Sequence, residues 1–413
     1  MRIGGALYRA ARTTARAIVD ETRLHSIALL RSRFRRRHAR PCGRGGLFGV
    51  NLVGYIRAEM GLGTAARGLA DALEAAQIPF TILNVERGNR SRHSDLSWAH
   101  REASDAPYAF TLVCVNPDNS RNLRLSVPTA ALGSRYVIGH WYWEMPEWPD
   151  RWLPEIGLVD EIWSASAFMY DAVSAKASVP VVRVPTAVCP PSGVPYRRDY
   201  FALPEDKFLF LSMFDADSVL ERKNPWGSLQ AFRLAFPNQP REAALVMKVN
   251  NAGHDRGFID ELRARIGIGD DVFVLDRALS RDAVWALLSC CDCFLSLHRA
   301  EGFGLCPAEA MCLGKPAILT AWSGNVDYMR RDNSVGIDYT LVPLGRDHGP
   351  YRATQHWADP DLHQAAWWMR RLVREPGLAA AIGARGRETI QTSFSPRAVG
   401  ALIRQRLMVI AEC

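Results

Sequence analysis

The chain has 413 residues, of which 48% are hydrophobic and 23% are charged. This composition is typical of a soluble globular protein, and the length suggests two domains. The net charge of +8 is concentrated in residues 1–46, where twelve arginines and two acids give +10 and leave −2 for the rest of the chain. A near-neutral body does not indicate a nucleic-acid-binding protein.

The nine cysteines are odd in number and scattered, and Cys290-Cys291-x-Cys293 lacks the second pair that a zinc site would need. Reduced cysteines in the core are the favoured interpretation, which fits a cytoplasmic protein. No apolar run reaches the roughly 18–20 residues that span a bilayer. Arginines interrupt the first apolar residues, so we expect no signal peptide.

The basic N-terminal arm, residues 1–46, mixes apolar residues and arginines at loosely helical spacing, followed by an arginine cluster at 31–37. One hypothesis is a peripheral anchor on the anionic inner membrane face, where each basic residue contributes about 1 kcal/mol. A disordered basic tail is an alternative. An organelle transit peptide, also rich in arginine and poor in acids, is another.

From Leu47 onward, short apolar runs alternate with helical patterns. Strands are predicted at 47–53, 79–84, 109–115, 136–139, 161–163 and 181–184, and helices at 65–76 and 167–177. A glycine-bearing loop over 54–63 separates the first strand from the first helix. Five prolines between 185 and 204 indicate a linker, so we place the first domain at 47–195.

The second domain, predicted at 196–395, repeats this alternation. Strands are predicted at 208–213, 243–249, 272–275, 293–297 and 316–319, and helices at 225–236, 258–266, 282–288, 308–313, 359–373 and 376–392. A C-terminal helix within 396–413 is amphipathic enough to cross back to the first domain. The alternation favours an α/β fold with two Rossmann-like, doubly wound domains that face each other across a cleft, where ligands bind at the carboxyl ends of the strands.

The segment from His298 to Met311 combines a strand end, a glycine loop and a helix start, which together make an anion site. Two carboxylates, Glu301 and Glu309, flank that site. They would repel an anion unless they bind hydroxyl groups, and a nucleotide sugar supplies both phosphate and hydroxyls. The alternative is a pair of surface glutamates at a helix start.

The run from Arg299 to Met311, followed by Gly314-Lys-Pro-Ala-Ile, closely resembles the donor-site motif of retaining GT-B-fold glycosyltransferases of family 4, the group 1 glycosyltransferases. The resemblance implies that Glu301 lies beside the donor sugar and leaving phosphate, and that Glu309 holds the ribose hydroxyls. It also implies that the intervening loop binds the donor through Gly302, Phe303, Gly304 and Leu305.

Arg222 and Lys223 precede a helix start and can bind a diphosphate, the arginine bidentately and the lysine as a point charge. They match the family's diphosphate-binding pair, which implies a role in neutralising the leaving group in place of a metal. A solvated basic turn is the alternative. Asp215-Ala-Asp217 is similar to a metal motif of another glycosyltransferase fold, but its position fits a loop, so we expect neither a metal nor a cofactor besides the donor substrate.

Two further loops resemble donor-facing loops of the family. Gly61 and Gly63 stand where its glycine loop faces the donor phosphates and the acceptor. The loop after the predicted strand 316–319 departs from the family's usual Gly-Gly followed by an acid, and we expect donor contacts there from Ser323, Gly324 and Asn325.

On the acceptor side, His140 to Trp148 follows a strand end and is rich in aromatic residues. Aromatic faces suit sugar rings, so Trp141 and Trp143 are candidate acceptor-binding residues, and Glu144 could accept hydrogen bonds from hydroxyls. His140 is a candidate catalytic residue near the acceptor. The alternative is a packed aromatic corner.

The resemblance implies a cytoplasmic, retaining hexosyltransferase, such as a mannosyltransferase or a glucose-transferring enzyme. It would transfer the sugar to a saccharide or lipid-linked glycan in polysaccharide or lipopolysaccharide biosynthesis. The partners are then a nucleotide sugar, a glycan acceptor and, through residues 1–46, an anionic membrane. Two alternatives stay open: a nucleotide-sugar epimerase, and a non-catalytic module that binds nucleotide sugar or glycan.

Overall fold

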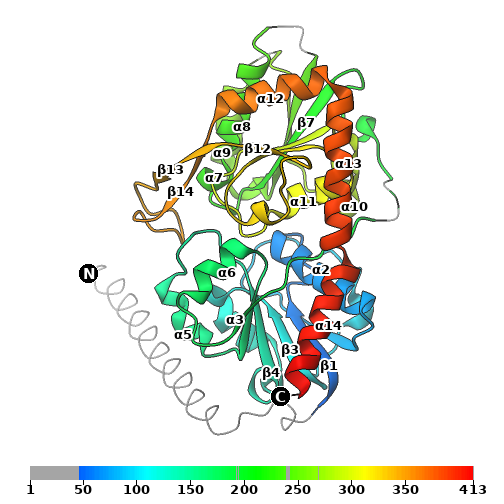
Figure 1. The fold of residues 1–413 in the computed structure, drawn as a ribbon, viewed down its shortest axis with the longest axis vertical. Helices are drawn as coiled ribbons and strands as arrows, with labels where there is room; N and C mark the ends of the chain where they lie inside the picture. Colours follow the sequence, from blue (N-terminus) through cyan, green and yellow to red (C-terminus); the bar gives the residue numbers. More distant parts are fainter. Residues whose placement is uncertain (1–45, 192, 194, 239–241, 268, 413) are drawn as a thin grey trace, which may run out of the picture.

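The computed structural model describes residues 46–191, 193, 195–238, 242–267 and 269–412. These residues form two six-stranded parallel sheets, one above the other in Figure 1, and a two-stranded antiparallel hairpin. The predicted α/β class with two doubly wound, Rossmann-like domains is confirmed. The predictions for the basic arm fall on residues that, apart from Gly46, lie outside the described part.

The first sheet has the strand order β2-β1-β3-β4-β5-β6. Its strands are β1 (Leu47–Gly54), β2 (Phe80–Asn84), β3 (Tyr108–Cys114), β4 (Tyr136–Trp141), β5 (Glu161–Ser164) and β6 (Val181–Arg183). One face is covered by α2 (Gly61–Ala75) and α14 (Pro396–Glu412). The other face is covered by α3 (Ser120–Ser126), α4 (Thr129–Gly133), α5 (Leu153–Ile156) and α6 (Ala167–Ser174). Because both faces are covered, its strands are continuously apolar.

The second sheet has the order β12-β11-β10-β7-β8-β9. Its strands are β7 (Phe208–Asp215), β8 (Ala243–Asn250), β9 (Val272–Leu275), β10 (Cys293–Ser296), β11 (Ala317–Thr320) and β12 (Val335–Ile337). On one face lie α8 (Pro225–Ala235), α9 (Arg256–Arg265) and α12 (Leu362–Arg374). On the other lie α10 (Arg281–Cys290), α11 (Leu305–Cys312) and part of α13 (Pro376–Ser393), and the short α7 (Leu220–Lys223) follows β7.

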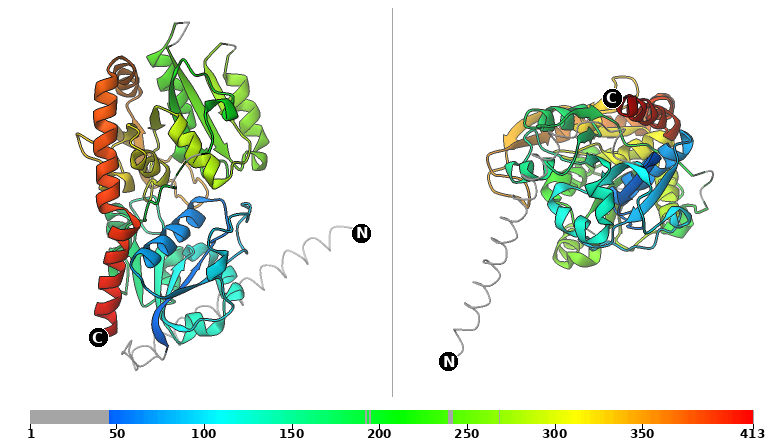
Figure 2. Two further views of the ribbon diagram at one scale, coloured as in Figure 1. Left: turned by 90° about the vertical axis from the view of Figure 1, so that its right-hand side faces the viewer. Right: turned by 90° about the horizontal axis from the view of Figure 1, so that it is seen from below.

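The C-terminal helices connect the two halves. In Figures 1 and 2, α13 runs along the second sheet and α14 continues along the first. Helix α14 packs so closely on α2 that a Cβ on Gly400 would lie 2.3 Å from the Ala72 carbonyl oxygen. Arg406 also donates to the fully buried Glu161 carboxylate at the core of the first domain. The chain end is therefore fixed to the first domain by packing and by a compensated buried charge.

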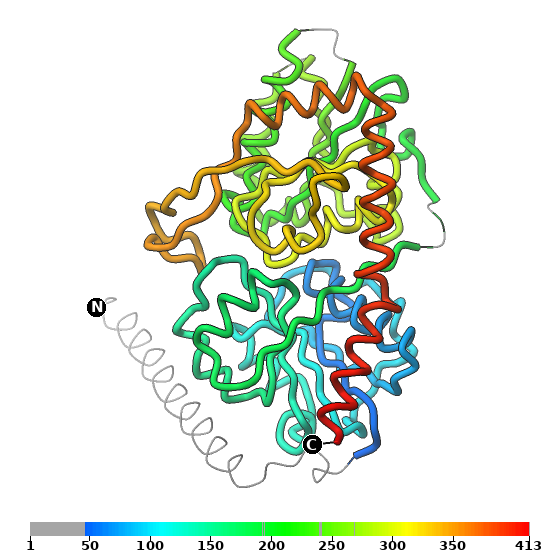
Figure 3. Tube along the Cα trace, in the orientation of Figure 1, coloured from blue at the N-terminus to red at the C-terminus, as the bar shows by residue number. Residues whose placement is uncertain are grey.

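Two differences from the predicted elements affect the site. Helix α2 begins at Gly61 rather than near residue 65, so the two glycines lie in its first turn and not in a loop. The hairpin of β13 (Tyr339–Pro343) and β14 (His356–Pro360) was not predicted. It leaves the second domain and reaches the first, as the orange segment of Figure 3 shows. No helix of the described residues is long and apolar enough to cross a membrane.

Candidate active site

The candidate site lies where the carboxyl ends of the two sheets meet. Glu301 follows β10, Arg222 and Lys223 follow β7, and Glu144 follows β4 of the first sheet. The two sides touch here, because the Ser166 hydroxyl of the first domain donates to the Gly302 carbonyl at 2.6 Å. Parallel sheets present their ligand-binding loops at this edge.

Arg222, Lys223 and Glu301 converge on one another. Lys223 Nζ lies 2.5 Å from Glu301 Oε1, and Arg222 Nη1 lies 3.3 Å from Glu301 Oε2. Burial alone would raise the pKa of Glu301, but Lys223 and Arg222 outweigh it and lower the pKa to about 2. Glu301 is therefore an anion across the physiological range, and it pairs with both cations of the turn.

The turn that carries the two cations is fixed by Asn224. This residue adopts a left-handed conformation (φ 51°), accepts a hydrogen bond from Gly227 N–H and donates to the Leu297 carbonyl at 2.8 Å. Arg222 itself donates to the Ala300 carbonyl. The cations are thus held by β10 and by the start of α8, which preorganises them.

Glu144 comes into the same site from the first domain. Its Oε1 lies 3.8 Å from Arg222 Nη2, and its Oε2 accepts a hydrogen bond of 2.9 Å from the Tyr351 hydroxyl. Tyr351 lies between β13 and β14, whose connection also places Arg346 and His348 beside Glu221. Sequence reasoning missed Tyr351, since nothing in a segment without helical or strand periodicity indicated that it folds over the first domain.

Glu309 is not a free hydrogen-bond acceptor. It is buried in α11, and its carboxylate pairs with both terminal nitrogens of Arg281 at the start of α10. Arg281 in turn lies over the Trp285 ring, 4.8 Å from its centroid. Sequence reasoning missed this partner. Because of the pair, a ribose bound by Glu309 would have to share the carboxylate with Arg281.

The predicted donor loop is packed tightly against its surroundings. A Cβ on Gly302 would lie 3.1 Å from the Trp143 carbonyl, and one on Gly304, at φ +81°, would lie 2.5 Å from the Tyr328 hydroxyl. Phe303 is buried against Tyr328 and Phe394, which places its side chain in the core rather than at the donor. Leu305, at the first position of α11, is half-buried.

The loop after β11 supports Glu301 from behind. The Ser323 hydroxyl accepts a hydrogen bond of 2.7 Å from Glu301 N–H, and Asn325 is fully buried between His298 and the Thr320 carbonyl. Ser323 adopts φ +75°, a backbone conformation that favours glycine. Gly324 packs on the Gly302 carbonyl. The side chains of Ser323 and Asn325 are thus engaged in hydrogen bonds that position the loop.

The two glycines of α2 have different surroundings. Gly63 packs on the Ala58 carbonyl, where a Cβ would lie 2.1 Å away, so its role is packing. Gly61 is exposed and nothing lies within 4 Å of the position of its Cβ. Met60 provides no side-chain cap, so the first N–H groups of this 15-residue helix stay available to an anion.

The structure corrects the predictions for His140, Trp141 and Trp143. His140 is fully buried in β4, where a ring nitrogen lies 3.1 Å from the Val184 carbonyl, and burial lowers its pKa to about 4. Trp143 is buried against Trp152 and Tyr351, with ring centroids 4.9 and 5.3 Å away. Trp141 stacks on Trp148. The aromatic residues form a packed corner, and neither His140 nor Trp143 has a surface for an acceptor in this conformation.

The Asp215 and Asp217 carboxylates are engaged by residues at the end of β8 and after it. Asp215 accepts hydrogen bonds from Asn250 and Asn251, and Asp217 lies 2.9 Å from the His254 ring. Across the described residues, no group of three or more His, Cys, Asp or Glu side chains could hold a metal ion. A metal-independent reaction remains a prediction.

Comparison with known proteins identifies the part of the chain that carries Glu301. Residues 198–338 match the family model of glycosyl transferases group 1. A further similarity covers 122 residues of the chain, which are 28% identical to the human alpha-1,3/1,6-mannosyltransferase ALG2. The matched segment is 30% of this chain and 24% of ALG2, so the chain spans about a quarter of that relative.

Solved structures extend the similarity to both domains. Sucrose-phosphate synthase from Thermosynechococcus elongatus aligns with a TM-score of 0.63 at 16% identity, over 88% of this chain and 99% of its own. Anabaena Alr3699/HepE, solved in complex with UDP and glucose, aligns with a TM-score of 0.59 at 14% identity, over 88% of this chain and 100% of its own. Identity this low shows the fold alone, and the predicted GT-B arrangement is confirmed.

Proposed function

We propose that the protein is a retaining glycosyltransferase. It moves a hexose of the mannose or glucose type from a nucleoside-diphosphate sugar to a saccharide or lipid-linked glycan, in polysaccharide biosynthesis. The observation that carries the proposal is the convergence of Arg222, Lys223 and Glu301 at the junction of the domains, inside the segment that matches group 1 glycosyl transferases. The mannosyltransferase relative and the complex of HepE with UDP and glucose support the class of sugar.

The reaction breaks the bond between the anomeric carbon and the diphosphate and forms a bond from that carbon to an acceptor oxygen. The diphosphate gains negative charge as it leaves, so Arg222 and Lys223 stabilise the transition state more than the bound donor. With retention, the acceptor hydroxyl attacks from the face that the leaving group departs from, and the leaving phosphate takes the hydroxyl proton. Glu301 accepts hydrogen bonds from the sugar, and Glu144 accepts them from the acceptor.

Donor binding tests the proposal directly. GDP-, UDP- and ADP-sugars are screened by thermal shift, and a ligand at 100 times its Kd should stabilise the protein by about 2.7 kcal/mol. Product analysis follows with and without a saccharide acceptor. A new glycosidic product that requires the acceptor supports the transferase.

The two alternatives give different results in the same assay. An epimerised donor without added acceptor would identify an epimerase, and tight binding without transfer or hydrolysis would identify a non-catalytic module. Absence of stabilisation by every nucleotide sugar would contradict all three. Membrane contact through residues 1–46, and a place at the cytoplasmic face, stay predictions within this proposal.

A further inference from the structure

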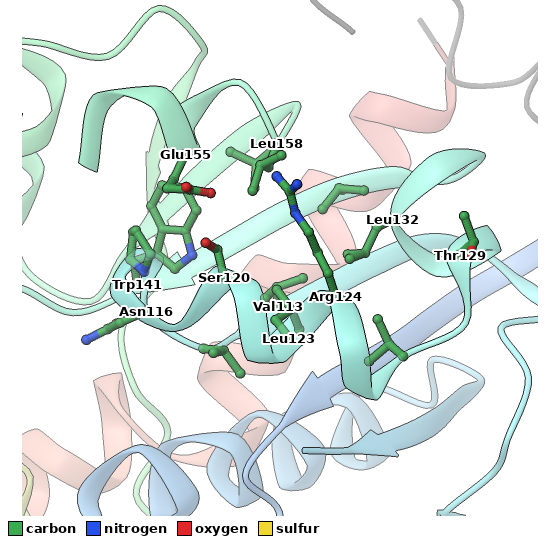
Figure 4. Close-up of a pocket in the computed structure, with 15 residues that line it drawn as sticks. Val113, Asn116, Ser120, Leu123, Arg124, Thr129, Leu132, Trp141, Glu155 and Leu158 are labelled. Carbon is green, nitrogen blue, oxygen red and sulfur yellow. The ribbon is translucent and has the colours of Figure 1, made fainter. Parts of the chain in front are cut away.

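The first domain contains a cavity whose lining does not include Arg222, Lys223 or Glu301. It has a volume of about 230 Å³ and lies between α3, α4 and α5 on the face of the sheet opposite α2 and α14. Figure 4 shows its wall, which is mainly aliphatic, with Trp141 at one end. The aliphatic side chains are Val113, Val115, Leu123, Val127, Leu132, Val137, Leu158 and Val159. Small-molecule sites are typically concave and mostly apolar with a few polar groups, and this lining has that character.

One oxygen atom of a carboxyl group inside this wall lacks a hydrogen-bond partner among the described residues. This atom is the buried Glu155 Oε2. Burial raises the pKa of Glu155, whereas a hydrogen bond from Ser120 and the charge of Arg124 act in the opposite direction. Figure 4 places these three side chains together between the aliphatic ones. A buried acceptor without a donor is costly, and a bound ligand with a hydroxyl or amine would remove that cost.

The helices around the cavity also carry exposed apolar side chains. Leu125 of α3 is 62% exposed and Leu153 of α5 is 36% exposed.

The volume of the cavity corresponds to about eight groups of methylene size, if each occupies about 30 Å³ as a water molecule does. Volume and wall chemistry together fit a single aliphatic chain better than a sugar, because a sugar would bring several hydroxyls to a wall with few partners for them.

We propose that this cavity binds one aliphatic chain of about eight carbons that carries a hydrogen-bond donor for Glu155. Two sources share that chemistry: the lipid part of a glycan acceptor, and a free membrane amphiphile. The binding site is independent of Glu301, Arg222 and Lys223, so it does not rest on the transferase activity.

Straight-chain alcohols from pentanol to decanol, titrated calorimetrically into the full chain, test the site. Affinity should rise about fourfold per methylene up to about eight carbons and then level off, as expected for burial of CH₂ groups. Octanol should bind about two- to tenfold more tightly than a methyl ether of the same length, and Glu155→Leu should remove that preference. Affinity that does not depend on chain length would overturn the proposal.

Val127→Trp fills the cavity and should abolish alcohol binding. Val409→Trp, on the exposed surface of α14, is the matched control and should bind like the wild type. Circular dichroism reports whether Val127→Trp folds, and if it does not, Leu158→Trp fills the cavity from another wall. Binding that survives in a folded, filled variant would also overturn the proposal.

Two comparisons of the wild type with the filled variant then distinguish a lipid-linked acceptor from a membrane amphiphile as the source of the aliphatic chain. If the chain belongs to the acceptor, octyl glycosides should have a lower KM than methyl glycosides in the wild type alone. If it belongs to a membrane amphiphile, vesicles of phosphatidylglycerol and phosphatidylethanolamine should retain less of the filled variant. Failure of the transferase assay with intact alcohol binding would contradict the proposed function and leave the cavity assignment standing.

Discussion

The proposed donor side and the proposed acceptor side of the candidate site differ in where their charged and aromatic residues lie. In the second domain, the charged residues that the motifs indicated converge in space: Lys223 and Arg222 meet Glu301. In the first domain, the aromatic residues and His140 are buried. Glu144 reaches the junction through its carboxylate, whereas Trp143 reaches it by packing on Tyr351. Charged side chains are costly to bury without partners, so a motif of charges at strand ends indicates a site, whereas aromatic residues serve a core equally well.

The largest expected effect is on stability, and it tests whether Trp143 is a core residue or an acceptor-binding residue. Trp143→Ala should lower the free energy of unfolding by about 3–5 kcal/mol, because it removes a large buried ring and its hydrogen bond to the Glu147 carbonyl. Urea unfolding measures this change. Trp367→Ala, at a tryptophan that is 49% exposed on α12, is the control and should change stability far less. Unchanged stability with a large loss of acceptor affinity would restore the acceptor role of Trp143.

The next effect tests the donor side. Lys223→Ala should cost about 2.7–4 kcal/mol of activation free energy, or about 10²–10³ in kcat, because the leaving diphosphate loses a preorganised cation. Steady-state turnover of a nucleotide sugar measures it. Lys207→Ala removes a lysine that pairs with Asp271 elsewhere in the second domain, and it should retain turnover. Near-normal turnover of Lys223→Ala would exclude the proposed role.

His140 should make the free energy of unfolding depend on pH. Its pKa falls from an ordinary 6.5 to about 4 on folding, so below pH 6.5 the unfolded chain binds a proton that the folded chain does not. The contribution of neutral His140 to the free energy of unfolding is fully present above pH 6.5. It falls by about 3 kcal/mol as the pH falls toward 4. Urea unfolding across this range should show a shallower pH dependence for His140→Gln than for the wild type. Equal slopes would mean that His140 is accessible to protons in the fold.

The smallest expected effect tests the junction of the two sides. Tyr351→Phe removes the hydroxyl that binds Glu144, and the free energy of unfolding should fall by about 1.5 kcal/mol, the low end for a hydrogen bond to a charged group that is partly exposed. Because Glu144 is also freed, the KM for the acceptor should rise more than the KM for the donor. Tyr339→Phe, at an exposed position of β13, is the control. A rise in the donor KM alone would place Tyr351 on the donor side.

Most of the fold followed from local patterns. Every predicted strand lies on an observed strand within a few residues, because buried parallel strands are continuously apolar and the helices between them are amphipathic. The hairpin of β13 and β14 escaped prediction, since its burial depends on Trp143 and Glu147 in another domain. The domain division at residue 195 falls between β6 and β7 and stays a prediction.

The sequence by itself determined the alternation of strands and helices. It indicated Arg222, Lys223 and Glu301 as candidates because charged side chains at strand ends are costly to bury without partners. Only the tertiary structure decided which side chains are free to act. It paired Glu309 with Arg281, set Ser323 behind Glu301, buried His140 and brought Tyr351 to Glu144. The physical reason is that burial and partnership depend on contacts between residues far apart in the chain, which no local pattern contains.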